Sequence, residues 1–310
     1  MVTTNKYNLP SPFVRYNEAR NAAYSRGKAD ISVTQLIDSP RIRLLREAHA
    51  GELTDDVIDS IWALFGTAVH VVLDKNADPN DVTEQRLSMK INGWVLGGGV
   101  DHQKVMGNKR IITDYKVTSV WSVMLGSKQS WVDQQNCYAE LVENETGDTV
   151  TEIRICAMLR DWSRREASYK KDYPQTPVVV IDLPLWKKAE RIKFLEDRVA
   201  LHQDAQADFD KHNILAECKD HEKWAKPDSW ALMKGKNKRA TKVFTDEAEA
   251  NTALKGYPSF SPSQGYRLEH RQGENTRCDN NYCGVSEKCP CQMEINALRV
   301  LDKLKGSDDQ

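Results

Sequence analysis

The sequence predicts a mixed α/β or α+β fold, in which helices surround a short central sheet. Two observations lead to this prediction. Apolar residues from Val57 to Leu73 recur at a helical period. Downstream, strand-like runs are separated by the turn signals Asn92-Gly93 and Gly107-Asn108, which favour hairpins. The chain shows no internal repeat, so one main core is expected.

The expected elements follow in chain order. Residues 1–30 contain Pro10 and Pro12 and little periodicity, so we expect them to be loosely ordered. The remaining elements are a helical region Val33–Lys75, an antiparallel meander 84–117, a helix 128–144, a strand Thr151–Leu159, a loop or short helix Asp161–Tyr173, a strand Pro177–Leu183 and a long charged helix Leu185–His212.

The C-terminal part is harder to interpret. Trp224 and Trp230 suggest a small packed subregion, and we expect a short helix Asp246–Leu254, a strand Tyr266–His270 and a last helix 287–304. We therefore expect an N-terminal arm 1–30, a catalytic core 31–215 and a C-terminal region 216–310 that is rich in cysteine.

Composition favours a soluble, folded protein. At 310 residues with 40% hydrophobic and 29% charged residues, the chain can bury a substantial core. No apolar run in the sequence looks long enough for a membrane span, and no signal peptide is apparent, so we expect the cytoplasm of a bacterial or phage-infected cell. The net charge of −1 argues against binding nucleic acid by bulk charge. Local basic stretches, such as Arg160–Lys171, would be needed, although such runs are more often solvated faces.

Two aspartates and a lysine are the most informative residues. Asp101 and Asp114 lie on neighbouring strands of a predicted hairpin, and Lys116 follows Asp114 by two positions, on the same strand face. Two converging carboxylates repel each other unless a hard divalent cation lies between them. A lysine beside that cation could orient a water for attack on phosphate. Taken alone, the Asp-x-Lys triplet is more often a surface hairpin with scattered charge.

Two helices add further candidates. His70 and Asp74 are four residues apart and share one helix face, and so do Gln134 and Tyr138. Each pair alone means little, because a lone histidine on an apolar helix is usually a core residue. The order Gly-Thr-x-x-His, Gly-x-x-Asp, Asp-x-Lys and Gln-x-x-x-Tyr is more specific than any single pair.

With these motifs, the sequence resembles the PD-(D/E)XK nuclease superfamily, in its RecB-type branch with the phage and CRISPR-associated exonucleases. The resemblance covers residues 30–140 and again the C-terminal cysteines. It implies a restriction-endonuclease-like core with a central mixed sheet. By position, His70, Asp101, Asp114 and the Tyr115 carbonyl resemble ligands of Mg²⁺ or Mn²⁺, and Lys116 the catalytic lysine. Gln134 and Tyr138 resemble a motif that borders the active site and contacts DNA, and Asp74 stands where many members carry Glu.

The resemblance implies a metal-dependent DNA exonuclease for recombination, repair or degradation, and we expect 5′→3′ polarity. Its substrates would be linear single- or double-stranded DNA, with a recombination protein or a second copy as a possible partner. The alternatives are a structure-specific or end-processing endonuclease, and a catalytically silent DNA-binding or scaffold protein. Because the aspartates must be ionised, activity should fall at acidic pH.

A cysteine cluster near the C-terminus predicts a second metal site. Four of the seven cysteines lie within fourteen residues, and in a reducing compartment such clusters favour metal over disulfide. Either a [4Fe-4S] cluster or Zn²⁺ is compatible with four thiolates. In the family a further cluster cysteine precedes the core, where this chain has Ser39, so Cys291 is expected as the fourth ligand. The predicted ligands are Cys278, Cys283, Cys289 and Cys291.

Overall fold

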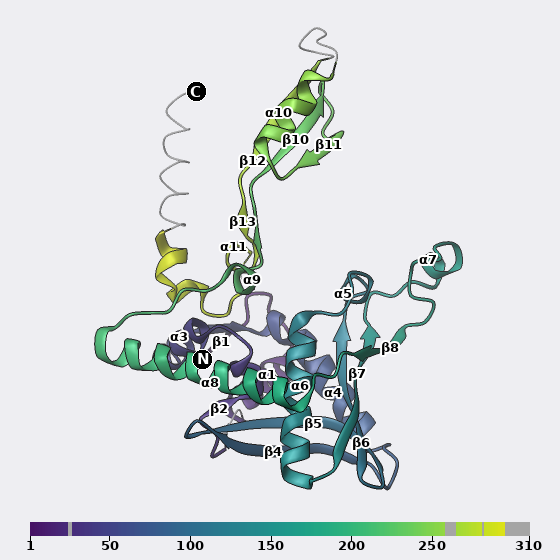
Figure 1. Ribbon diagram of the computed structural model, residues 1–310, viewed down its shortest axis with the longest axis vertical. Coiled ribbons are helices and arrows are strands. Elements are labelled where there is room, and N and C mark those ends of the chain that lie inside the picture. The colour runs from purple at the N-terminus through teal and green to yellow at the C-terminus, as the bar shows by residue number, and fades with distance from the viewer. Residues whose placement is uncertain (24–26, 258–264, 281, 295–310) are drawn as a thin grey trace. The chain divides into compact units, whose positions relative to one another are not determined.

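The chain forms two compact units, Met1–Ala216 and Glu217–Gln310. The computed structural model describes residues 1–23, 27–257, 265–280 and 282–294 (Figure 1). The first unit contains a mixed sheet flanked by helices, as the sequence predicts. The second contains a small antiparallel sheet and the cysteine cluster.

The main sheet has six strands, in the order β2-β5-β6-β7-β8 with β4 paired to β5. Strands β4, β5 and β6 are antiparallel, which confirms the predicted meander, whereas β6 and β7 run parallel. The turn between β4 and β5 has positive φ at both Asn92 and Gly93, the conformation that tight hairpins require. The strands are β2 Ile31–Ser32, β4 Val82–Ile91, β5 Trp94–Met106, β6 Lys109–Thr118, β7 Thr149–Leu159 and β8 Val178–Leu183.

Helices cover this sheet (Figure 1). Helix α6 packs across several strands, α8 packs on α6 and on α3, and α4 lies against β5 and β6. Residues 161–173, expected as a loop or short helix, contain α7. The helices are α1 Ser11–Ala23, α2 Val33–Leu36, α3 Pro40–Ala48, the 3₁₀ helix η1 Val57–Ser60, α4 Ile61–Asp74, α5 Trp121–Met124, α6 Gln129–Thr146, α7 Arg164–Tyr169 and α8 Lys188–His212.

Helix α6 is buried on nearly all sides because the sheet and α8 enclose it. Its buried polar side chains therefore find their partners inside the protein. The Arg191 guanidinium on α8 donates to Glu140 Oε2 at 3.0 Å and to Glu143 Oε2 at 2.5 Å. Buried charges need such partners, so this pairing holds α8 against α6.

Gly98 on β5 lets α6 approach the sheet closely. A Cβ at this position would lie 2.7 Å from Tyr138 Cε1, 3.1 Å from Leu141 Cδ1 and 3.1 Å from Val33 Cγ2. These neighbours are buried side chains with little room to move.

We expect Gly98→Ala to lower the free energy of unfolding by about 1–3 kcal/mol, the usual cost of overpacking a core. Gly99→Ala is the matched control, since a Cβ there meets nothing within 4 Å. Urea unfolding of both variants measures the difference. Equal stability of the two variants would contradict the close packing of α6 on β5.

The first thirty residues contain regular structure, where we expected a loosely ordered arm. Strand β1 (Val2–Thr4) pairs in parallel with β3 (Thr54–Asp56), and α1 begins at Ser11 with Pro12 in its first turn. Proline is compatible with that position because its missing N–H would be unpaired there anyway. The Asn17 amide reaches the Asp55 carbonyl at 3.3 Å, which ties α1 to the segment before α4.

Helix α4 contradicts the expectation that no apolar run is long enough for a membrane span. Val57–Asp74 has a mean hydropathy of 1.5 over 18 residues, and only 11% of this window is buried. By length and composition it could cross a membrane, but it packs on β5 and β6, and His70 in it faces strand residues. Its exposed apolar side chains therefore belong to the surface of the first unit.

The second unit has a three-stranded antiparallel sheet of order β11-β10-β12, with α10 packed on it. The predicted helix 246–254 and strand 266–270 are confirmed as α10 and β12. The predicted last helix 287–304 lies mostly outside the described residues. The elements are α9 Asp220–Lys223, β9 Ala225–Lys226, β10 Ser229–Lys234, β11 Lys242–Phe244, α10 Glu247–Lys255, β12 Tyr266–Arg271, β13 Glu274–Asn275, α11 Thr276–Asp279 and η2 Ser286–Lys288.

Candidate metal centre

The candidate site lies where β5 and β6 separate. The pairing of these strands runs from Met106 with Lys109 to His102 with Thr113, and it stops before Asp101 and Asp114. Beyond this point the Asp101 carboxylate takes over the role of a strand carbonyl, because its Oδ2 accepts the Tyr115 N–H at 2.9 Å. The separation opens space between the strands for side chains of both.

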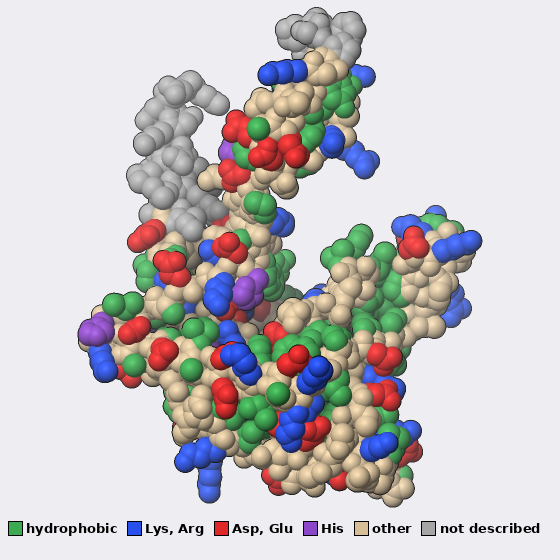
Figure 2. All heavy atoms as spheres, viewed as in Figure 1, with side chains coloured by type: hydrophobic (Ala, Val, Ile, Leu, Met, Phe, Trp, Pro, Cys, Tyr) green, Lys and Arg blue, Asp and Glu red, His purple; other side chains and the backbone are tan. Residues whose placement is uncertain are grey.

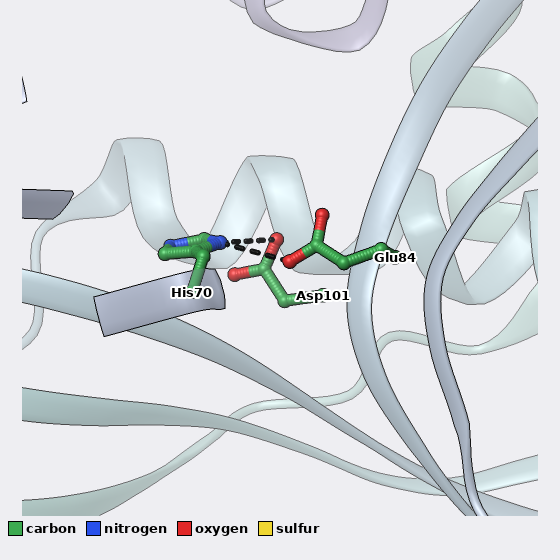
Figure 3. A group of neighbouring side chains, drawn as sticks. All are labelled: His70, Glu84 and Asp101. Atoms are coloured by element: carbon green, nitrogen blue, oxygen red, sulfur yellow. Dashed lines mark hydrogen bonds and ion pairs between the residues drawn. The ribbon is translucent and has the colours of Figure 1, made fainter. Parts of the chain in front are cut away.

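A group of three side chains from different elements meets there. His70 on α4, Glu84 on β4 and Asp101 on β5 each place a potential ligand atom within 4.8 Å of the others (Figure 3). His70 Nδ1 lies 3.1 Å from Glu84 Oε1 and 3.7 Å from Asp101 Oδ1. Within the described part of the chain, this is the group of histidine, cysteine and acidic residues compact enough to hold a metal ion.

Both ring nitrogens of His70 face acceptors. While Nδ1 faces the two carboxylates, Nε2 lies 3.2 Å from the Tyr115 carbonyl oxygen. A neutral imidazole has one N–H and can donate a hydrogen bond to only one of these acceptors. If Nε2 donates to the Tyr115 carbonyl, a proton or a metal ion is required between Nδ1 and the carboxylates. This donor set therefore fits a cation.

Glu84 is the residue that the sequence reasoning missed. Its φ is +47°, in the left-handed region that few residues other than glycine adopt. The pairing of β4 with β5 passes from Thr83–His102 to Gln85–Val100 and skips Glu84 and Asp101, which leaves both side chains available to the site. Strained backbone of this kind is often found at functional sites. The sequence shows only that an acidic residue lies in the strand beside the strand of Asp101. Without the pairing register of the two strands, this does not place Glu84 at the site.

Asp114 and Lys116 form the second half of the site. The Lys116 ammonium lies 2.9 Å from Asp114 Oδ1 and 2.7 Å from Oδ2, and Asp114 is 3% exposed. Despite the short distance, Oδ2 accepts no well-directed hydrogen bond among the described residues. This buried oxygen thus keeps acceptor capacity that a metal ion or water could use.

The two aspartates are held in an environment that disfavours their charge. Burial is the main cause that raises the pKa of Asp114 to about 6, and Asp101 raises it further, whereas Lys116 lowers it. Burial also raises the pKa of Asp101, against the lowering influence of His70 and the Tyr115 N–H, and Glu84 adds to the increase. A bound cation would relieve this accumulation of negative charge.

Gln134 and Tyr138 lie behind the carboxylates rather than at the surface. They are 7% and 5% exposed, and the Gln134 amide donates to the Tyr138 hydroxyl at 3.0 Å. Burial, together with the charges of Asp114 and Asp101, raises the pKa of Tyr138. This position supports the site from the core side and leaves little surface for contact with DNA. Asp74 is exposed and accepts a hydrogen bond from Thr83, the residue before Glu84.

The clustered cysteines lie in the second unit and differ in burial. Cys283 is buried, Cys278 and Cys289 are partly buried, and Cys291 is exposed. Burial raises the pKa of Cys278 to about 11, and the neighbouring Cys283, Cys218 and Cys289 add to this. Cys218 is therefore a further thiol near Cys278. No three of these thiols approach within 4.8 Å in the described residues.

Ser39 occupies the position where the family resemblance places a cysteine. It lies at the start of α3, fully buried, and its N–H donates to Asp38 Oδ1 at 2.8 Å. The same segment is held by α8, whose Arg198 side chain donates to the Leu36 and Asp38 carbonyls. Ser39 is the N-cap residue of α3, and its side chain makes no capping hydrogen bond there.

Comparison with known proteins gives only distant similarities. No protein-family model and no curated protein matches the sequence. The crystal structure of SSO0001 is 16% identical with a TM-score of 0.43, over 62% of this chain and 85% of that one. A protein from Eubacterium rectale named "Putative exonuclease" is 13% identical with a TM-score of 0.29, over 65% of this chain and 81% of that one. At these TM-scores, neither similarity bears on the function.

Proposed function

We propose that the chain is a metal-dependent nuclease that hydrolyses phosphodiester bonds in DNA, with a restriction-endonuclease-like core of the RecB type. The observation that carries the proposal is the convergence of His70, Glu84 and Asp101 beside Asp114 and Lys116. Four of these five residues were expected from their order in the sequence. A chance hairpin would not bring a helix histidine to the same point.

Glu84, Asp101 and Asp114, with His70, are the residues that would hold Mg²⁺ or Mn²⁺. A ligand set of carboxylate oxygens and one imidazole binds hard divalent cations better than it binds metals that prefer thiolates. When bound, such an ion polarises the scissile phosphate and lowers the pKa of a coordinated water. The Tyr115 carbonyl, expected as a further ligand, lies 3.2 Å from His70 Nε2 and so also helps to orient the ring.

Lys116 would act on the phosphate or on the attacking water. Its ammonium is paired with Asp114, and its side chain is 29% exposed, so it can turn toward a bound substrate. A cation at this point stabilises the negative charge that develops on the phosphate oxygens. The Tyr115 N–H holds the Asp101 carboxylate in place, because it donates to the oxygen that does not face His70.

A nuclease assay tests the proposal. The purified chain is incubated with Mg²⁺, Mn²⁺ or EDTA and with linear duplex labelled at either end, single strands or closed circles. Loss of linear DNA only with metal, and with circles intact, would identify an exonuclease, and the label lost first would give its polarity, which we propose to be 5′→3′. Cut circles would identify an endonuclease. No cleavage under any condition would favour a DNA-binding or scaffold protein.

We also propose that the cysteine cluster binds Zn²⁺ or an iron–sulfur cluster through Cys218, Cys278, Cys283 and Cys289. What supports this set is the folding of the second unit. Helix α9, just after Cys218, packs on α11, which carries Cys278, and β9 pairs with β13. The Cys283 N–H donates to the Arg277 carbonyl at 3.0 Å, which brings the next thiol back to α11. Metal binding would draw the thiols together.

We expect Cys218→Ser to remove most of the bound metal, whereas Cys291→Ser should leave it unchanged. The physical reason is that an exposed thiol outside the group contributes no ligand. Metal content by plasma mass spectrometry and the visible absorption spectrum measure both the amount and the kind of metal. The reverse ranking of the two variants would restore Cys291 as the fourth ligand.

A further inference from the structure

An aromatic pair on α4 is exposed near the candidate metal centre. Trp62 and Phe65 have ring centroids 5.6 Å apart and remain 48% and 52% exposed. Large aromatic side chains usually bury most of their surface, so two neighbouring exposed rings need an explanation. They stand on the helix that carries His70, which follows Trp62 by eight residues, roughly 12 Å along the helix axis.

One cation lies against these rings, and a second is near it. The Arg160 guanidinium lies 4.2 Å from the Trp62 ring centroid. The Lys128 ammonium lies 5.2 Å from the Trp131 ring centroid, and burial together with the nearby charge of Arg160 lowers its pKa. Neither has a carboxylate within salt-bridge distance among the residues that the structure describes. Two neighbouring cations without an anion form a site that is complementary to phosphate.

Arg160 also links the rings to the metal centre. It follows β7, and its N–H donates at 2.9 Å to the carbonyl of Thr118, which lies two residues after Lys116 on β6. Arg160 and the Trp62 ring under it therefore lie at the strand ends, close to the proposed catalytic lysine. On the face shown in Figure 2, apolar side chains also gather over α5, directly after β6.

We propose that Trp62, Phe65, Arg160 and Lys128 bind an unpaired DNA strand, with bases stacked on the rings and phosphates held by the cations. Single-stranded nucleic acid is recognised by this combination of aromatic faces and basic groups. Bases in a duplex are stacked on each other and cannot use the rings. This inference rests on the proposed nuclease function and specifies its substrate as a strand that is single at the point of entry.

Binding can be measured without cleavage. Fluorescence anisotropy in EDTA compares a labelled oligo(dT), longer than a typical single-strand site, with a blunt duplex of the same length. We expect Trp62→Ala to weaken binding of the single strand about tenfold or more, the effect of losing one stacked base, with little change for the duplex. Arg160→Ala should weaken it in a salt-dependent manner. Trp62→Phe should restore most of the affinity, since it keeps an aromatic face.

Val72→Ala is the matched control, because Val72 is an apolar residue on the same helix, 58% exposed, without a ring. We expect it to bind as the wild type does. If Trp62→Ala and Val72→Ala bind the single strand equally well, the proposal is wrong. The proposal is also wrong if Trp62→Ala converts a dimer into a monomer in light scattering while single-strand binding is kept, which would make this face a contact between copies.

Failure of this inference can be distinguished from failure of the proposed function. Single-strand binding that depends on Trp62, in a protein that cleaves nothing with either metal, would support the binding surface and overturn the nuclease. Metal-dependent cleavage, together with unchanged single-strand binding by Trp62→Ala, would support the nuclease and overturn the binding surface. Thermal unfolding by circular dichroism checks that each variant is folded, which the exposure of Trp62 leads us to expect.

Discussion

Asp114→Asn should abolish DNA cleavage, with a loss of at least about 10²–10³-fold, because the amide removes a ligand charge for the metal at the scissile phosphate. The same substitution should leave the fold intact. Asp114 is 3% exposed, and burial raises its pKa to about 6, so its charge is costly in the metal-free protein. At pH 8 the metal-free variant should therefore unfold at a higher temperature than the wild type.

Metal provides an internal check on this prediction. The proposed function predicts that Mn²⁺ raises the unfolding temperature of the wild type by binding the folded chain, whereas Asp114→Asn should show little increase. Asp182→Asn is the control, since this aspartate lies on β8 of the same sheet with its side chain 80% exposed. If Asp114→Asn cleaves DNA within a few-fold of the wild type, the site is assigned wrongly. If it unfolds at low temperature in every condition, Asp114 has a structural role.

Activity should fall steeply on acidification, beginning near pH 6 and reaching about tenfold or more at pH 5. Protons compete with metal for Asp114, whose pKa is raised from 3.8 to about 6, and for Asp101, whose pKa is also raised. An ordinary aspartate would keep its charge down to about pH 4. Cleavage rates from pH 5 to 8 at two metal concentrations measure this, and more metal should move the decline to lower pH.

The stability of the metal-free protein should respond in the opposite direction. Since the folded pKa of Asp114 lies above the unfolded value, the folded chain holds a proton that the unfolded chain has released between about pH 4 and pH 6. This carboxyl therefore makes the fold less stable as the pH rises through that window. This pH dependence of stability should be absent in Asp114→Asn.

For activity, a profile that is flat down to pH 4.5 would show that neither raised pKa governs catalysis.

Much of the fold could be predicted from local sequence patterns. The turn Asn92-Gly93 located the hairpin of β4 and β5, and the helical period from Val57 to Leu73 located α4, because both signals depend only on neighbours along the chain. The N-terminal arm was misjudged for the same reason. The pairing of β1 with β3 is a contact between segments about fifty residues apart, and no local pattern records it.

The candidate site shows the same division. Asp101, Asp114 and Lys116 could be expected together because strand alternation and one hairpin place them, and the order of motifs added His70. Glu84 required the strand register and a left-handed backbone at that residue. The helical period of α4 did not reveal its exposed rings, since a periodic apolar pattern predicts a helix face but cannot say whether anything covers it.

The sequence by itself determined the order of helices and strands and the residue types of a metal-dependent site, because propensity, periodicity and turn chemistry act over a few residues. Only the tertiary structure decided which distant groups meet. It brought Glu84 to His70, placed Gln134 and Tyr138 in the core, brought Cys218 near Cys278, and left Trp62 exposed under Arg160. These contacts depend on packing and register summed over the whole unit, which no short stretch of sequence contains.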